Sequence, residues 1–200
     1  MKSLLLQLDS LLVTRSPLFA THFRKGLHEA SICRRLKALA CLGPIVDWYS
    51  WHDGVNYVRK SIGIDHYEYT LAGLEFALRP LPFYMIQFSH AYQDWVMWKA
   101  MSARVKGFSN LESYFPLLRS DSHEWLGISS TGGGDVQYIN IRDELMTVAY
   151  PNFERMIQDL IRSNREGLPL SFFRPSSKAA DDLYGSVYNR LANRIEDGSD

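Results

Sequence analysis

The chain has 200 residues, of which 46% are apolar and 22% are charged, and both values are ordinary for a folded globular protein. A chain of this length buries roughly 70% of its unfolded surface, so it can form a core without disulfide or metal cross-links. Basic and acidic residues both number 22, and the resulting net charge of zero argues against a nucleic-acid-binding protein or an acidic solvating tail.

This net charge of zero conceals a gradient along the sequence. Residues 1–110 contain 13 basic and 8 acidic side chains, an excess of +5, whereas residues 111–200 contain 9 and 14, an excess of −5. Much of the positive excess lies in residues 1–40. Two interpretations stay open for this basic segment, a solvated helix face and an electrostatic docking surface.

Cysteine usage and hydropathy indicate the compartment. Only Cys33 and Cys41 are present, and on one continuous helix they would lie roughly 12 Å apart, too far for a disulfide. Asp9 interrupts the N-terminal leucine run, no cleavage site follows before Arg15, and no stretch reaches 18 apolar residues. We therefore expect a cytoplasmic protein that does not enter a membrane.

Helical patterns dominate the first half. Leucines at helical spacing predict a helix over residues 4–12, and Ser16-Pro17 can begin a second one. Ser31 precedes a third short apolar stripe. A further helix is predicted over residues 44–54, with Asp53-Gly54 as its left-handed C-terminal cap.

A small sheet is predicted after residue 110. Before it, residues 66–70 favour a strand, residues 72–78 a short helix, and residues 89–105 a helix. Strands are then predicted over 114–119, 125–129 and 136–141, and their short connections favour an antiparallel meander. A helix with its apolar stripe at 153, 156, 157, 160 and 161 should dock on that sheet. A last helix over 178–195 could pack back, dimerise or hold a partner.

Motifs for catalysis are weak in this sequence. Gly132-Gly-Gly-Asp135 lacks the lysine of a phosphate-binding loop, so a hairpin turn is the better interpretation. The six histidines show no zinc-ligand spacing, and the adjacent pairs His52-Asp53 and His123-Glu124 cannot face each other on a helix or strand. We expect no catalytic residues, no metal and no cofactor.

Acidic and aromatic residues leave two alternatives open. Asp121, Glu124 and Asp135 could converge at one end of the meander as a carboxylate cluster, or they could be solvated turn residues. The tryptophans at 48, 51, 95 and 98 could form a stacking platform, although their helical spacing favours packing in the core.

Five segments resemble motifs of the SUKH superfamily, and they occur in the expected order. Trp48-Tyr-Ser-Trp-His-Asp-Gly54 resembles the superfamily's "Tyr-x-Trp-His-Asn/Asp-Gly" helix end, and residues 69–77 resemble its strand and "Leu-x-x-Ala" helix. Residues 114–121 are similar to its "Phe-Pro-Ile-Ala-x-Asp" strand, residues 133–140 to its Gly-Asp turn and strand, and the helix from Asn152 to its closing helix. Asn140 stands where aspartate is common, and the segment 83–110 is a long tryptophan-rich insertion.

The resemblance implies a single α+β domain. Its central sheet would be mixed or antiparallel with flanking helices, extra N-terminal helices and a C-terminal helix. The SUKH-like domain would span residues 1–172 with a core from about residue 31, followed by a linker and helix over 173–200.

The resemblance also implies a function without catalysis. The superfamily groups SMI/KNR cell-wall-assembly regulators with bacterial immunity proteins that neutralise a cognate toxin, so the expected partner is a toxin domain. Neither nucleic acid nor membrane is expected as a partner, and the chain could be a monomer or a homodimer. The alternatives are a regulatory scaffold in cell-wall or signalling assembly and an enzyme with a scattered site. The partner-binding residues are expected at the exposed helix end and turns: Trp51, Asp53, Asp121, Glu124, Trp125 and Asp135.

Overall fold

A computed structural model of the chain describes residues 1–15, 23–37, 43–55, 58–61, 67–70, 83–119, 124–131, 134–166 and 170. The chain divides into two compact units, Met1–Leu170 and Ser171–Asp200, and every described residue belongs to the first. This unit has an α+β fold, as predicted. Its described α-helices are α1 Lys2–Arg15, α3 Glu29–Arg35, α4 Gly43–Trp51, α6 Phe88–Ser102 and α7 Phe153–Glu166.

The main sheet is antiparallel throughout its described length, and its strand order follows the sequence. The strands are β5 Tyr84–Met85, β6 Tyr114–Arg119, β7 Glu124–Ser129, β8 Val136–Asn140 and β9 Leu145–Tyr150. The predicted meander is thus confirmed in β6, β7 and β8, and β5 and β9 extend it on either side. Two small antiparallel sheets pair β1 Phe23–Lys25 with β2 His52–Val55 and β3 Val58–Ser61 with β4 Tyr67–Thr70.

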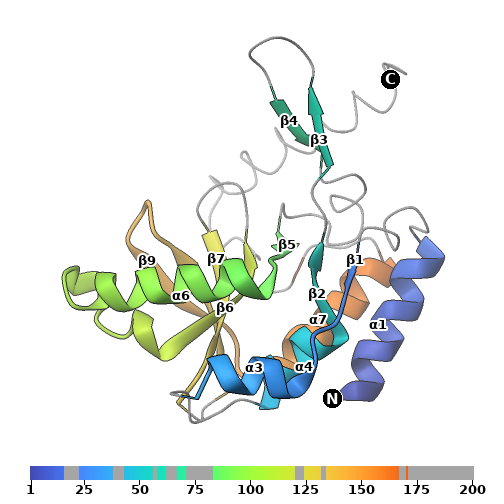
Figure 1. Cartoon of the computed structure of the whole chain (residues 1–200), viewed down its shortest axis with the longest axis horizontal. Helices are drawn as coiled ribbons and strands as arrows, with labels where there is room; N and C mark the ends of the chain where they lie inside the picture. Colours follow the sequence, from blue (N-terminus) through green and yellow to red (C-terminus); the bar gives the residue numbers. More distant parts are fainter. Residues whose placement is uncertain are drawn as a thin grey trace. The chain divides into compact units, whose positions relative to one another are not determined.

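Helix α6 crosses one face of the main sheet (Figure 1). Its Trp98 is fully buried and packs edge-on against Trp125 of β7, with ring centroids 6.0 Å apart. A Cβ atom at Gly127 would lie 3.2 Å from the Trp98 ring, so the absence of a side chain there permits the close approach. Trp48, Trp95 and Trp98 are all buried, which confirms the core interpretation for these three tryptophans.

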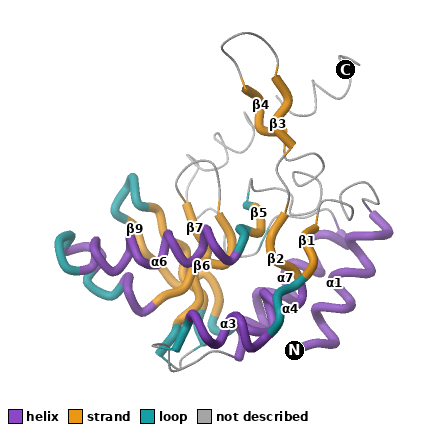
Figure 2. The backbone as a smooth tube through the Cα atoms, viewed as in Figure 1, coloured by secondary structure: helices purple, strands orange, loops and turns teal. Residues whose placement is uncertain are grey.

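Helix α7 has the predicted apolar stripe, and all five of its residues are buried. The side chain of Asn152 accepts a hydrogen bond from the backbone N–H of Arg155 at 2.8 Å, which fixes the first turn. The stripe meets the N-terminal helix, since α1 and α7 lie side by side (Figure 2) and Leu5, Leu8 and Leu12 of α1 are buried.

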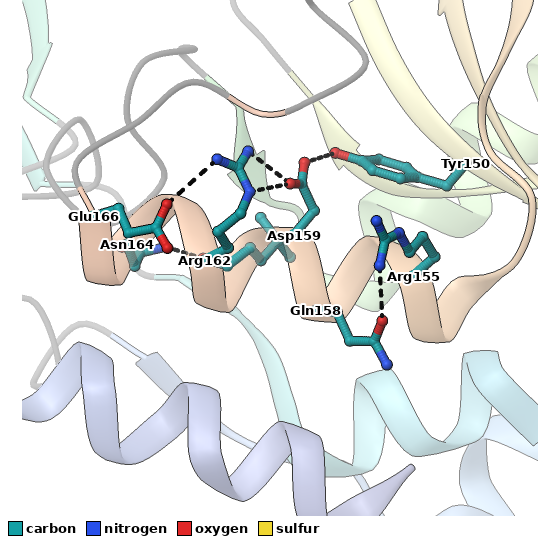
Figure 3. Close-up of polar contacts among 8 residues, drawn as sticks. Tyr150, Arg155, Gln158, Asp159, Arg162, Asn164 and Glu166 are labelled. Carbon is teal, nitrogen blue, oxygen red and sulfur yellow. Dashed lines mark hydrogen bonds and ion pairs between the residues drawn. The ribbon is translucent and has the colours of Figure 1, made fainter.

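The buried carboxylate of Asp159 joins α7 to the main sheet and also forms an ion pair within α7 (Figure 3). Asp159 is only 5% exposed, and its carboxylate accepts a hydrogen bond from the Tyr150 hydroxyl at 2.8 Å. On its other oxygen it meets the Arg162 guanidinium, with Nε at 2.9 Å and Nη2 at 2.8 Å. Burial and the Asp159 carboxylate raise the pKa of Tyr150, so its hydroxyl remains a donor.

The helix predicted over residues 44–54 ends earlier than expected. It stops at Trp51, and residues 52–55 form β2 against β1, so the prediction that Asp53-Gly54 caps the helix is wrong. Gly54 does take a left-handed conformation, with φ of +74°. It lies inside a strand, where an added Cβ atom would come within 2.6 Å of the Gln87 backbone nitrogen and 2.7 Å of the Ile86 carbonyl carbon.

The third predicted helix also differs. His28 precedes α3 and accepts a hydrogen bond from the Ala30 N–H at 3.3 Å, so the helix begins before Ser31, which lies inside it. The helix ends at Arg35, and Cys33 is a free thiol in it. Cys41, the helix from Ser16-Pro17, and those over 72–78 and 178–195 lie outside the described residues.

Candidate functional site

The predicted partner-binding residues do not share one surface. Asp121 lies outside the described residues. Glu124 pairs with Asn140 at one end of the β7–β8 hairpin, whereas Asp135 directly precedes Val136, which pairs with Ile128 at the other end. Four to five residues of extended strand separate them, roughly 15 Å. Of the two alternatives left open for these carboxylates, the structure therefore excludes the convergence of Glu124 and Asp135 at one end of the meander.

Asp53 holds the start of α6 in place. Its side chain is buried, and Oδ1 accepts a hydrogen bond from the backbone N–H of Phe88, the first residue of that helix, at 2.8 Å. Its other oxygen lies 3.4 Å from Nε of Arg24. A carboxylate at a helix N-terminus satisfies a free N–H group and complements the helix dipole. The expectation that Asp53 is exposed is wrong, and its observed contacts are structural.

Trp51 and Asp135 have local partners. The Trp51 ring is half-buried, and its centroid lies 5.8 Å from that of Phe23 and 4.5 Å from that of His52. Asp135 accepts hydrogen bonds from the Tyr114 hydroxyl at 3.2 Å and from Nε2 of Gln137 at 2.8 Å. Both residues are partly accessible, at separate places on the domain.

Trp125 is also buried, contrary to expectation. It is 2% exposed, and its indole N–H donates to Oδ2 of Asp94 on α6 at 2.9 Å. The Arg119 guanidinium lies 5.1 Å from the centre of the Trp125 ring and 3.8 Å from the Asp94 carboxylate. Sequence reasoning missed Asp94 and Arg119 because no motif connects them with β7.

The opposite side of the same strands carries a second polar row. The Tyr138 hydroxyl donates to Oε1 of Glu124 at 2.6 Å, and Nδ2 of Asn140 donates to Oδ2 of Asp143 at 2.8 Å. The backbone N–H of Asp143 donates in return to Oδ1 of Asn140 at 3.0 Å. Burial, followed by the Glu124 contact, raises the pKa of Tyr138, so this hydroxyl keeps its proton and fixes the carboxylate.

These two rows form the candidate site, which we call the polar end of the sheet. It consists of Asp94, Arg119, Glu124, Trp125, Tyr138, Asn140 and Asp143. In the described part of the chain, no three histidine, cysteine, aspartate or glutamate side chains gather closely enough to hold a metal ion. Glu124 and Asp143 are fixed in place through neutral donors, an arrangement suited to presenting negative charge, whereas Asp94 lies beside the Arg119 guanidinium.

Asp94 is the perturbed carboxyl of this site. Burial raises its pKa above the ordinary value of 3.8, and the Trp125 indole and the Arg119 guanidinium oppose that shift only in part. The folded protein therefore keeps the Asp94 proton to higher pH than the unfolded chain does. The stability that Asp94 contributes is present below about pH 3.8 and is lost as pH rises through the folded-state pKa.

We expect the Asp94→Asn variant to gain stability relative to the wild type as pH rises through this window. Asparagine cannot ionise, yet its carbonyl can still accept the Trp125 indole bond. Urea unfolding of both proteins at several pH values between about 4 and 8 measures the difference in unfolding free energy. A difference that stays constant over this range would contradict the assignment.

Compared with models of known protein families and with curated proteins, the chain matches none. None of the helices in the described ranges combines the length and hydrophobicity needed to cross a membrane.

Proposed function

We propose that this protein is a non-catalytic binding module of the SUKH type, acting in the cytoplasm as an immunity protein that binds and neutralises a cognate toxin domain. The observation that carries the proposal is the fixed acidic row of Glu124 and Asp143, held by Tyr138 and Asn140. The resemblance of residues 31–172 to SUKH motifs supplies the class of partner.

Fixed carboxylates favour binding to a positively charged partner. Because hydrogen bonds already order Glu124 and Asp143, association loses less side-chain entropy than it would with free side chains. The turn that contains Asp143 has three consecutive charged residues at the surface, because Arg142, Asp143 and Glu144 are all exposed. A toxin with a basic active site, such as a nuclease that binds phosphate, would be attracted to this end of the sheet.

Reversing charge at the turn is expected to weaken toxin binding. In the Asp143→Lys/Glu144→Lys variant the partner meets two positive charges, and we expect at least a tenfold loss of affinity, about 1.4 kcal/mol. The measurement is titration calorimetry with a purified candidate toxin domain taken from a neighbouring gene, together with survival of cells that express both.

The matched control is Glu29→Lys, a charge reversal at an exposed position of α3. It should keep both affinity and protection, and thermal melting should show that all variants are folded. If the double variant binds as tightly as the wild type, the polar end of the sheet is not the contact surface. If the wild type neither binds the toxin nor protects cells, the proposed function is wrong.

A further inference from the structure

The two edges of the main sheet differ in length and composition. At one end of the strand order, β5 has two residues, whereas at the other end β9 has six. The β9 sequence, Leu-Met-Thr-Val-Ala-Tyr, has neither charge nor proline, the residues that commonly protect an edge from pairing. No strand within the described ranges lies beyond β9, and Figure 1 draws it on the side of the sheet away from β5.

Apolar side chains flank this edge on both faces. Val148 pairs with Gln137 and Met146 with Ile139, on the face covered by α6, whereas Leu145 pairs with Asn140 on the other face. Val148 is 60% exposed and Leu145 is 46% exposed. The pairing with β8 is regular over residues 145–148, and Ala149 is the extra residue of a bulge. The backbone N–H and C=O groups of this edge lie in the plane of the sheet, and apolar side chains lie above and below that plane. A strand fits this arrangement better than a helix does, because its own backbone can pair with these groups.

We propose that β9 pairs antiparallel with β9 of a second copy of this chain, joining the two main sheets into one. An antiparallel pair of identical strands lies on a twofold axis, which closes the assembly as a dimer. The neutral strand places no like charges opposite each other. In a register centred near Val148, every pairing within Leu145–Tyr150 is between uncharged residues, so no charge repulsion opposes the pairing.

The symmetry makes Val148 the sensitive position. A twofold axis perpendicular to the sheet keeps the α6 faces of both copies on the same side, so the two Val148 side chains meet on that face. Depending on the register, the two Val148 residues are directly opposite or diagonal neighbours across the strand pair, with their Cβ atoms about 5–8 Å apart. Lysine at this position would therefore place two positive charges together, whereas lysine on one copy and glutamate on the other would attract.

Sedimentation equilibrium of the full chain across a concentration series tests the dimer. The wild type should reach the mass of two chains, and Val148→Lys and Val148→Glu alone should each remain at the mass of one. An equimolar mixture of Val148→Lys and Val148→Glu should recover the mass of two chains. The matched control, Val96→Lys on the exposed face of α6, should dimerise like the wild type.

Several outcomes would overturn the proposal. The proposal is wrong if the wild type stays monomeric at the highest concentration or if the Val148→Lys variant still dimerises. It is also wrong if the Val96→Lys variant dissociates as readily as the Val148→Lys variant. Failure of the mixture to dimerise would also reject pairing through Val148. Circular dichroism should show that each variant is folded. The proposal goes beyond toxin binding and is independent of it, because the measurement involves this chain alone.

Discussion

Replacing Gly54 with alanine should lower the free energy of unfolding by about 3 kcal/mol or more. Two effects act together at this position. The left-handed conformation, with φ of +74°, costs a non-glycine residue about 1–2 kcal/mol. A Cβ atom would also lie 2.6 Å from the Gln87 nitrogen and 2.7 Å from the Ile86 carbonyl carbon, both of them backbone atoms that cannot rotate away. Urea unfolding measures the loss.

Other glycines separate the two effects. Gly134 has φ of +65° with nothing within 4 Å of an added Cβ, so Gly134→Ala should show only the conformational cost. Gly26 does not adopt a left-handed conformation, but an added Cβ would collide with the Ser50 carbonyl oxygen. The stability lost in Gly26→Ala should therefore come from this clash alone. At Gly43 there is neither a left-handed conformation nor an atom within 4 Å of an added Cβ, so Gly43→Ala should leave the free energy of unfolding nearly unchanged. If Gly54→Ala proves no more harmful than Gly134→Ala, the contact with Gln87 is not tight.

Replacing Asp159 with alanine should cost about 2–3 kcal/mol of unfolding free energy. The variant leaves the Arg162 guanidinium and the Tyr150 hydroxyl without the carboxylate that both contact. The main cost is the lost hydrogen bonds to a buried carboxylate, because the Arg162 side chain is 32% exposed and also lies 3.7 Å from Glu166. Urea unfolding at neutral pH measures the loss, with Arg155→Ala on the exposed face of α7 as a control expected within about 0.5 kcal/mol.

A double variant distinguishes the charge from the packing. Asp159→Leu/Arg162→Met removes both charges and keeps similar volume, so it should be less destabilised than Asp159→Ala. If the double variant is instead the less stable of the two, the ion pair contributes more than its desolvation costs. If Asp159→Ala loses under about 1 kcal/mol, the carboxylate is not buried as described.

Much of the secondary structure could be predicted from local patterns. Helix α7 has clear apolar periodicity, strands β6, β7 and β8 are short apolar runs bounded by turn residues, and all four were predicted within a few residues. Strand β9 was not predicted, because its apolar run follows the charged turn 142–144 and lacks the alternation that marks a strand. The end of α4 depends on pairing with β1 and on contact with Gln87, and neither partner is near it in the sequence.

The candidate site was harder to predict than the fold. Trp125 and Asp53 stand close to turns, which suggested exposure, but Asp94 and Phe88 reach them from α6, more than 30 residues away. Asp143 could have been suggested by its Asn140-x-x-Asp143 spacing, which is typical of a side-chain-stabilised turn. Contacts between distant segments, which a single sequence does not show, decide which acidic residues are buried.

The contacts of Asp53 and Gly54 with residues 86–88 have a consequence for how this protein tolerates change. They hold the chain at residues 53–54 directly against the chain at residues 86–88, so the two ends of the intervening stretch are fixed close together. A segment whose two ends are already fixed can lengthen at a cost of only about 0.6 kcal/mol for each doubling. The stretch that contains β3 and β4 is therefore the natural place in this domain for inserting a tag, a reporter or a new binding loop.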